Sequence, residues 1–140
     1  MANTIHVDIV SAEGEIFSGP AKMVFLPAAE GEIGVAPRHA PLLALLKAGE
    51  VRVQPVEGDE QFFYVGGGAL EVQPARVTVL ADTAARAADL DEAAALAARQ
   101  RAEEALSGKI DRIEQAEALA ELARAAAQLK LIERLRKIRG

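Results

Sequence analysis

Two histidines, His6 and His39, are the side chains best suited to bind a metal ion or to transfer protons in this chain of 140 residues, which has no cysteine. The absence of cysteine excludes a disulfide framework, a thiolate nucleophile, an iron–sulfur cluster and a cysteine-based zinc site. The histidines lack the HxH or HxxH spacing that places two ligands on one metal. No serine or carboxylate has the context of a catalytic triad. We therefore predict no metal site and no catalytic residue, and we expect His39, between Pro37 and Pro41, to be a surface contact or an ordinary loop residue.

The run Gly66-Gly67-Gly68 could suggest a loop that cradles phosphate, but no Lys-Ser/Thr pair or helix start follows it. A kink or bulge between two strands, or a close approach of another backbone segment, is the better interpretation. A second polar feature is a set of carboxylates in predicted turns. They have no spacing that defines an acid/base pair, and a solvated face is expected for Glu30, Glu32, Glu57, Asp59 and Glu60.

The charge balance is mildly acidic, with 16 Lys+Arg against 21 Asp+Glu and a formal net charge of -5. This argues against a nucleic-acid-binding protein, which needs a basic surface. The longest stretch without a charge, Gln61 to Leu70, is far shorter than the roughly 20 apolar residues that cross a bilayer. The N-terminus has no basic cluster followed by an apolar run, so we predict no secretory signal and a cytoplasmic protein.

The composition changes near residue 84 and predicts two domains, 1–84 and 85–140. All six prolines and all five aromatic residues lie before residue 75, whereas 18 of the 45 residues from Ala84 to Gln128 are alanine. Up to Asp82, short runs rich in Val, Ile and Phe alternate with Gly and Pro, which is typical of strands joined by turns. We therefore predict an all-β part followed by a helical part.

Ile5, Val7 and Ile9 alternate with polar His6 and Asp8, which indicates a half-buried strand. About eight to ten short strands predict a sandwich or flattened barrel. The prolines Pro55 and Pro74 are expected at strand ends or edges because they donate no backbone hydrogen bond. Further strands are expected at Ala21–Leu26, Glu32–Ala36, Leu42–Lys47, Glu50–Val56, Gln61–Val65, Ala69–Gln73 and Arg76–Leu80.

Two helices are predicted after residue 84, and they should form an antiparallel hairpin. Asp89 with Glu92 fits a capping box, so the first helix should begin near Leu90 and run to about Leu106, before Ser107-Gly108. The second helix should run from near Asp111 to about Arg136. Its apolar face is expected at the three- and four-residue spacing of Leu119, Leu122, Ala126 and Leu129.

An alanine-rich seam buries little apolar area per residue, so the hairpin should be only marginally stable. Such a hairpin can leave one docking surface for another, as a switching element must, and a static appendage fits the composition equally well.

Positive charge is concentrated at the C-terminal end of the second predicted helix. Residues 1–84 carry five basic and eleven acidic side chains, whereas residues 85–140 carry eleven basic and ten acidic ones. The helix dipole accounts for one or two basic residues at this end. The larger number predicts an acidic partner surface. Opposed only by Glu133, the basic residues are Lys130, Arg134, Arg136, Lys137 and Arg139.

Two segments, 30–43 (EGEIGVAPRHAPLL) and 67–82 (GGALEVQPARVTVLAD), resemble the epsilon subunit of bacterial F-type ATP synthase. The likeness runs from Ser11-Ala12-Glu13 through Leu90-Asp91-Glu92 to Ala120–Ala123 and covers essentially the whole chain. It implies a non-catalytic rotor subunit of the proton-translocating enzyme, whose β-sandwich binds the gamma subunit and rests on the loops of the c-ring, coupling proton flow to ATP synthesis from ADP and phosphate. The segments with Glu32 and His39 match the region that contacts the ring and gamma.

The resemblance also implies that the hairpin takes a compact form beside the sandwich and an extended form that inserts along gamma between the alpha and beta subunits and inhibits ATP hydrolysis. The side chains expected to face an acidic segment of the catalytic beta subunit are Arg124, Lys130, Arg134, Arg136 and Lys137. The subunit would lie peripherally on the cytoplasmic face of the bacterial plasma (inner) membrane, without insertion into lipid and without nucleic acid.

Some family members bind ATP through a Leu/Ile-Asp-x-x-Arg-Ala motif in the first helix and arginines in the second. This chain retains Asp91 and Arg124, but Ala94 stands at the position of the motif arginine, and Gln128 replaces an arginine of the second helix. Each lost guanidinium removes charge-assisted hydrogen bonds of roughly 1.5 to 3 kcal/mol. We therefore predict no cofactor and weak or absent ATP binding.

Two other functions remain as alternatives. A sandwich with acidic turns could be a carbohydrate hydrolase, although the chain has no tryptophan for a sugar platform. A helical hairpin could also be an independent scaffold that self-associates through Leu119, Leu122 and Leu129. Activity on a glycoside would favour the first, and a stable homodimer in sedimentation would favour the second.

Overall fold

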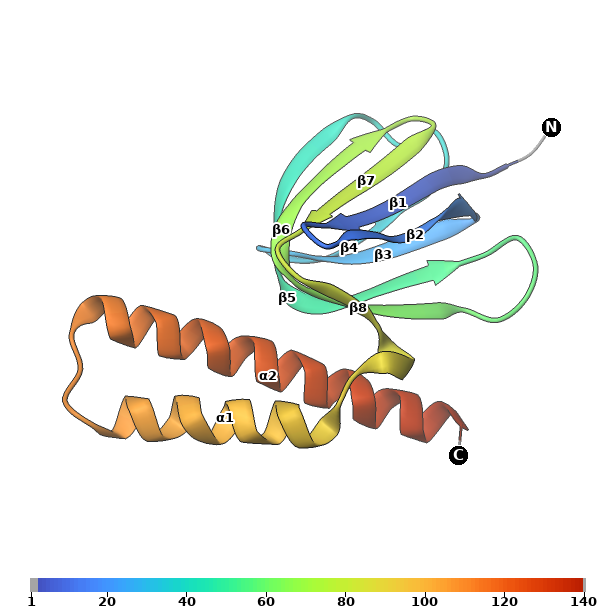
Figure 1. Ribbon diagram of the computed structural model, residues 1–140. Coiled ribbons are helices and arrows are strands. Elements are labelled where there is room, and N and C mark those ends of the chain that lie inside the picture. Colours follow the sequence, from blue (N-terminus) through green and yellow to red (C-terminus); the bar gives the residue numbers. More distant parts are fainter. Residues whose placement is uncertain (1–2, 140) are drawn as a thin grey trace. The chain divides into compact units, whose positions relative to one another are not determined.

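Strand β1 (Ile5–Ser11) buries Ile5, Val7 and Ile9 and turns the residues between them outward, as their alternation predicts. The structure is a computed structural model that describes residues 3–139 (Figure 1). The chain divides into two compact units, Met1–Arg86 and Ala87–Gly140. The composition predicts this boundary two residues earlier, after residue 84. Residues 1, 2 and 140 lie outside the described residues. They form the extreme ends of the two predicted domains, and residues 1 and 2 also begin the segment in which no secretory signal is expected.

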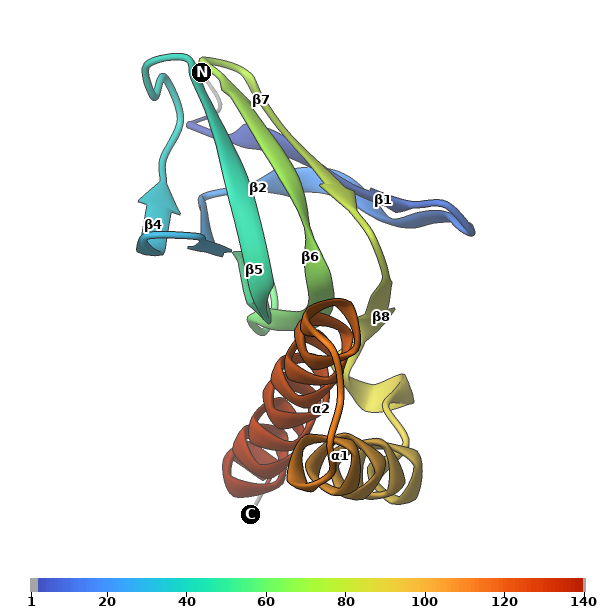
Figure 2. The same ribbon diagram turned by 90° about the vertical axis from the view of Figure 1, so that its left-hand side faces the viewer.

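The first unit is one antiparallel sheet except for a parallel pairing of β1 with β7. Figure 2 shows the sheet bending after β7, so that β1 and β2 run at a steep angle to β5 and β6. The inward side chains of this folded sheet form one apolar core, which confirms the predicted sandwich. The order is β2 (Gly14–Ala21), β1, β7 (Arg76–Ala81), β6 (Gln61–Gln73), β5 (Leu42–Gln54), β3 (Met23–Ala28) and β4 (Gly31–Val35), and β8 (Ala84–Arg86) also pairs with β6.

Some strand predictions were wrong. The two strands predicted within 42–56 are the single strand β5, and the two within 61–73 are the single strand β6. Strands β2 and β8 were missed, because β2 contains Gly19 and Pro20 and β8 has three residues. β2 tolerates Pro20 because it is an edge strand. Pro55 and Pro74 directly follow β5 and β6, in agreement with the prediction.

The three glycines lie inside β6 and not between two strands, which corrects the sequence prediction. β6 pairs with β8 from Phe63 to Val65 and with β7 from Gly68 to Gln73. A Cβ atom on Gly68 would lie 2.1 Å from the carbonyl oxygen of Leu80. The predicted close approach of another backbone segment is therefore present, and it requires glycine at this position.

The second unit is an antiparallel hairpin of α1 (Glu92–Ser107) and α2 (Arg112–Arg139), preceded by the 3₁₀ turn η1 (Ala87–Asp89). The helices lie side by side in Figures 1 and 2. The cap of α1 was predicted wrongly: the side chain of Asp91, not Asp89, accepts the backbone N–H of Ala94 at 3.2 Å. Neither helix combines the length and the apolar composition that a bilayer crossing requires.

Alanines occupy four of the five buried positions described in the two helices, and Leu131 is the fifth; we call the four alanines the seam. Ala95 and Ala102 of α1 are buried, and so are Ala118 and Ala125 of α2, each pair seven residues apart. The predicted stripe through Leu119 and Ala126 is displaced by one residue, since Leu119 is 50% exposed. Helix axes approach more closely over alanine than over leucine, so Ala118 is buried in the seam in place of the adjacent Leu119.

Candidate partner-binding surfaces

A groove of about 540 Å³ opens in the sandwich between the β3–β4 turn and the first residues of β5. Leu43 and Leu45 line it and are 78% and 69% exposed. Glu30 and Glu32 also line it, so apolar side chains and carboxylates share the opening. An apolar floor beside exposed charge is the composition of a protein–protein contact. The complete lining is Ala28, Ala29, Glu30, Gly31, Glu32, Ile33, Leu42, Leu43, Ala44 and Leu45.

The carboxylate of Glu32 is held by Arg52. Arg52 Nη2 lies 3.2 Å from Glu32 Oε1, and the β3–β5 register places Arg52 opposite Phe25. The guanidinium lies 4.3 Å from the centre of the Phe25 ring and is also 3.4 Å from Glu50 and 3.6 Å from Glu60. This half-buried cation orients Glu32 at the groove, a role that the sequence analysis did not assign.

The segment with His39 is a tight turn after β4. His39 Nδ1 donates to the carbonyl oxygen of Ala40 at 2.7 Å, and the His39 backbone N–H donates to Ala36 at 3.2 Å. The side chain is half-buried in this arrangement. Glu32 lies near the start of β4 and His39 follows its end, so about 10 Å of strand separates the two predicted contact residues.

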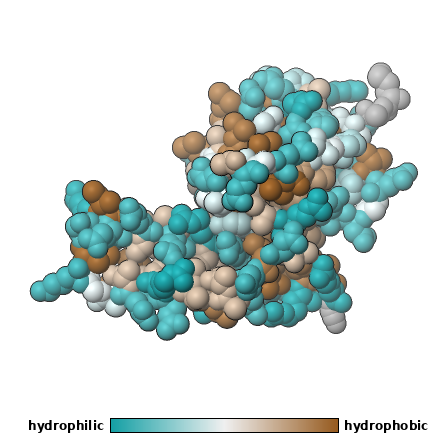
Figure 3. Space-filling model, viewed as in Figure 1, coloured by the Kyte–Doolittle hydropathy of each residue, from teal (hydrophilic) through white to brown (hydrophobic). Residues whose placement is uncertain are grey.

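A row of apolar side chains crosses the outer face of the sheet. The strand register places Val10, Leu80, Ala69 and Leu45 on neighbouring strands, in that order. Leu80 is 56% exposed. Brown atoms at the surface of the upper unit in Figure 3 show that apolar side chains reach solvent there. Alternation places each of these residues outward, and only the register shows that they adjoin.

His6 lies in a polar cluster on the outer face of β1 and β2. His6 Nε2 is 2.9 Å from Asp8 Oδ1 and 3.0 Å from Ser18 Oγ, and Ser18 Oγ donates to Asp8 at 2.7 Å. Arg76 forms a further ion pair with Asp8. Desolvation raises the pKa of Asp8, but the hydrogen bonds from Ser18 and His6 and the charges of His6 and Arg76 outweigh it, so the pKa lies below its ordinary value.

This cluster does not have the geometry of a catalytic relay. In a triad the serine donates to one histidine nitrogen while the other nitrogen donates to the carboxylate. Here the single nitrogen Nε2 of His6 faces both groups, and the hydroxyl of Ser18 donates to Asp8. Within residues 3–139, no group of three His, Cys, Asp or Glu side chains could hold a metal ion. The arrangement can bind a partner but offers no activated nucleophile.

The basic residues predicted near the end of α2 do not form one surface. Lys130, Arg134 and Lys137 lie within about 60° of one another around the helix axis. Arg136 lies about 100° from the nearest of them and forms a 3.0 Å ion pair with Glu92 of α1. Lys137 is 3.7 Å from Glu133 on its own helix.

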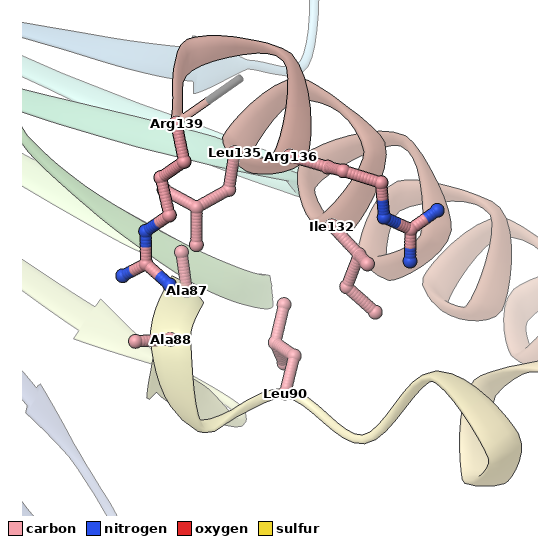
Figure 4. A pocket seen from close by; sticks show the side chains of 7 residues that line it. All are labelled: Ala87, Ala88, Leu90, Ile132, Leu135, Arg136 and Arg139. Carbon is pink, nitrogen blue, oxygen red and sulfur yellow. The ribbon is translucent and has the colours of Figure 1, made fainter.

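A pocket of about 420 Å³ separates η1 and the following Leu90 from the end of α2. Figure 4 shows Leu90 pointing toward Ile132 and Leu135, with the guanidinium groups of Arg136 and Arg139 on opposite sides. Leu90 directly precedes Asp91, the cap residue of α1.

Asp91 and Arg124, the residues retained from the ATP motif, are not brought together. Asp91 caps α1, and its neighbour Glu92 pairs with Arg136. Arg124 is half-buried and lies about 18 Å from Arg136 along the axis of α2.

Comparison with known proteins decides the family. Residues 4–87 match the family model "ATP synthase, Delta/Epsilon chain, beta-sandwich domain", and residues 88–133 match "ATP synthase, Delta/Epsilon chain, long alpha-helix domain". The chain is 66% identical to the ATP synthase epsilon chain of Nitrosococcus oceani over 140 residues, the full length of both. It is 62% identical to that of Alkalilimnicola ehrlichii over 135 residues, 96% of each.

The chain belongs to the ATP synthase epsilon chain family. The predicted family is thereby confirmed, and the chain is a non-catalytic subunit of an F-type ATP synthase. The family model for the helices ends at residue 133, so Arg134, Arg136 and Lys137 lie beyond the match.

Solved structures show the same fold at low sequence identity. A chain of the Euglena gracilis mitochondrial ATP synthase (OSCP/F1/c-ring, rotational state 1) has a TM-score of 0.70 and 19% identity, covering 100% of this chain and 84% of that chain. A chain of the Tetrahymena thermophila mitochondrial ATP synthase (central stalk/c-ring) has a TM-score of 0.61 and 12% identity, covering 91% of this chain and 96% of that one.

Proposed function

We propose that this chain is the central-stalk subunit that links the gamma subunit of the ATP synthase to its c-ring, and that its hairpin restrains ATP hydrolysis. The observation that carries the proposal is the 66% identity to an epsilon chain over the full length of both proteins. The Tetrahymena structure, described as central stalk and c-ring, supports the same location for this fold. The subunit then lies peripherally on the cytoplasmic face of the plasma membrane and needs no cofactor.

The sandwich provides two surfaces for this task. The groove with Glu32, oriented by Arg52, suits the polar loops of the c-ring, because a fixed carboxylate beside exposed leucines gives both specificity and buried apolar area. The apolar row of Val10, Leu80 and Ala69, which reaches the groove at Leu45, suits the gamma subunit. His39 stands at the other end of β4 and contacts gamma or the ring from there.

The hairpin supplies the regulation. Its alanine seam buries little area per residue, so α1 and α2 can separate at modest free-energy cost. In the extended form, the face made by Lys130, Arg134 and Lys137 meets an acidic segment of a catalytic beta subunit. Opposite charge brings the two together and slows hydrolysis.

Reconstitution tests the proposal. The purified chain is added to membranes whose ATP synthase has lost its own epsilon subunit. We expect it to remain with the membranes together with gamma, alpha and beta, to restore proton-driven ATP synthesis and to lower ATP hydrolysis. A chain that stays in the supernatant, or that restores nothing when bound, contradicts the proposal.

A further inference from the structure

Arg38 has a backbone conformation that the rest of the chain reserves for glycine. Its φ is 69°, and it is the only residue other than glycine with a positive φ within residues 3–139. The remaining positive-φ positions are occupied by Gly14, Gly31, Gly58, Gly67 and Gly68. A left-handed conformation strains a residue that has a Cβ atom, and a long side chain there is rare.

The surrounding turn enforces this conformation. The Arg38 backbone N–H donates to the carbonyl oxygen of Pro74 at 2.8 Å, which ties the turn to the end of β6. The His39 N–H donates to Ala36 at 3.2 Å, and prolines stand at positions 37 and 41. These contacts use the backbone and would be equally available to glycine. The turn therefore needs the conformation of residue 38 but not an arginine.

The guanidinium of Arg38 does not stabilise the sandwich. The residue is exposed, and the structure shows no hydrogen bond or ion pair from its side chain to residues 3–139. Two other arginines of the same unit are engaged, since Arg52 contacts three carboxylates and Arg76 contacts Asp8, whereas Arg86 at the end of β8 is exposed. Arg38 differs from Arg86 in its left-handed backbone. Residues with a strained backbone tend to occur at binding sites. Here the turn requires the strained conformation, but it does not require the arginine side chain.

We propose that Arg38 is a partner-contact residue whose guanidinium receives a carboxylate of a neighbouring subunit of the ATP synthase. This inference rests on the proposed function and adds a residue to the surface assigned there. The planar fork of arginine binds a carboxylate through two parallel hydrogen bonds, and the rigid turn presents it with little loss of backbone freedom. On a unit in which acidic residues outnumber basic ones, this cation also fixes the register of docking.

The test compares Arg38→Gly with the unchanged chain in two measurements. Glycine relieves the left-handed strain and removes the charge, so the full chain should melt about 3 °C higher. Its affinity for ATP synthase depleted of epsilon should fall about tenfold, and the remaining affinity should depend less on salt concentration. Lys22→Asn removes one exposed positive charge from the same unit and should bind as the unchanged chain does.

Each outcome decides the inference separately from the proposed function. If the unchanged chain does not bind the depleted complex, the proposed function fails. If it binds and Arg38→Gly binds equally well, or loses affinity with unchanged salt dependence, the contact is absent. A variant that melts lower and binds more weakly would assign Arg38 a structural role and contradict the inference. Binding to vesicles of phosphatidylglycerol that is lost in Arg38→Gly, with complex binding retained, would assign it to a lipid headgroup instead.

Discussion

Arg136 and Glu92 form an ion pair of 3.0 Å that joins the end of α2 to the first turn of α1, across 44 positions of sequence. Arg101 and Glu121 form a second pair between the helices at 3.3 Å. Both pairs are exposed and each contributes at most about 1 kcal/mol. The Arg136–Glu92 pair shows that Arg136 faces the partner helix, whereas Lys130, Arg134 and Lys137 share another face of α2.

Neutralising this basic face should release the restraint on hydrolysis. The variant Lys130→Gln/Arg134→Gln/Lys137→Gln loses three contacts with the acidic partner, each worth about 0.5 kcal/mol. The equilibrium between extended and compact hairpins should then shift about tenfold, and ATP hydrolysis by the reconstituted complex should rise. Arg136→Gln alone should have a smaller effect on hydrolysis.

A matched control removes the same charge elsewhere in the hairpin. The variant Arg99→Gln/Lys109→Gln/Arg112→Gln loses three positive charges from the middle of α1, the turn between the helices and the start of α2, and should leave hydrolysis unchanged. Equal activation by both triple variants would assign the effect to net charge and would contradict a contact through one face.

The alanine seam can be tested by two neighbouring substitutions. Ala118 is buried between the helices, so Ala118→Leu overpacks the seam and should lower the free energy of unfolding by about 1 to 3 kcal/mol. Leu119 is half-exposed, so Leu119→Ala should change it by less than about 0.5 kcal/mol. Urea unfolding of the full chain, followed by helical circular dichroism, measures both. The reverse order would place Leu119 in the seam, as the spacing in the sequence suggests.

The orientation of Glu32 by Arg52 should matter for stability and for binding. Arg52→Met keeps an apolar stem against Phe25 but leaves three carboxylates without their shared cation. We expect a loss of about 1 to 2 kcal/mol in thermal unfolding and weaker binding to the epsilon-depleted complex. Arg86→Met, at an exposed position in β8, is the control and should bind normally. Unchanged melting and binding of Arg52→Met would remove Arg52 from the docking surface.

The cluster around Asp8 makes the sandwich sensitive to acid. The pKa of Asp8 lies below its ordinary value of 3.8, so the folded chain favours the charged carboxylate. Its stabilisation is complete above pH 3.8 and is lost as the pH falls through the lower pKa of the folded state. Asp8→Asn should cost about 1 kcal/mol at pH 7 and show a flatter decline of stability as the pH falls below 3.8. Asp59→Asn, in an exposed turn, should retain the decline of the unchanged chain.

The sequence predicts what depends on local periodicity and fails where the choice depends on packing. Alternation at Ile5, Val7 and Ile9 identifies β1 because one face must be buried, and the composition separates strands from helices. Asp89 and Asp91 are both suitable helix caps, but Asp89 lies in the 3₁₀ turn η1, which the Leu90 N–H closes by donating to Ala87, so Asp91 caps α1.

The candidate surfaces show the same limit. Glu32 and His39 could be selected through the resemblance, but Arg52 depends on the register that places β5 beside β3. Leu80 of β7 and Leu45 of β5 lie on strands separated by β6, so only the sheet order shows that they belong to one row. Nothing in the sequence indicates the positive φ of Arg38, because glycine marks the other such positions.

ATP should not bind this hairpin in its unchanged form. Asp91 already accepts the Ala94 N–H as the helix cap, Ala94 supplies no guanidinium, and Arg124 lies far along α2. Calorimetric titration of the full chain should show no saturable heat at micromolar ATP. The variant Ala94→Arg/Gln128→Arg restores two donors worth about 1.5 kcal/mol or more each and should gain affinity at least about tenfold. Micromolar binding by the unchanged chain would contradict this account, because the remaining groups would then suffice without the motif arginine.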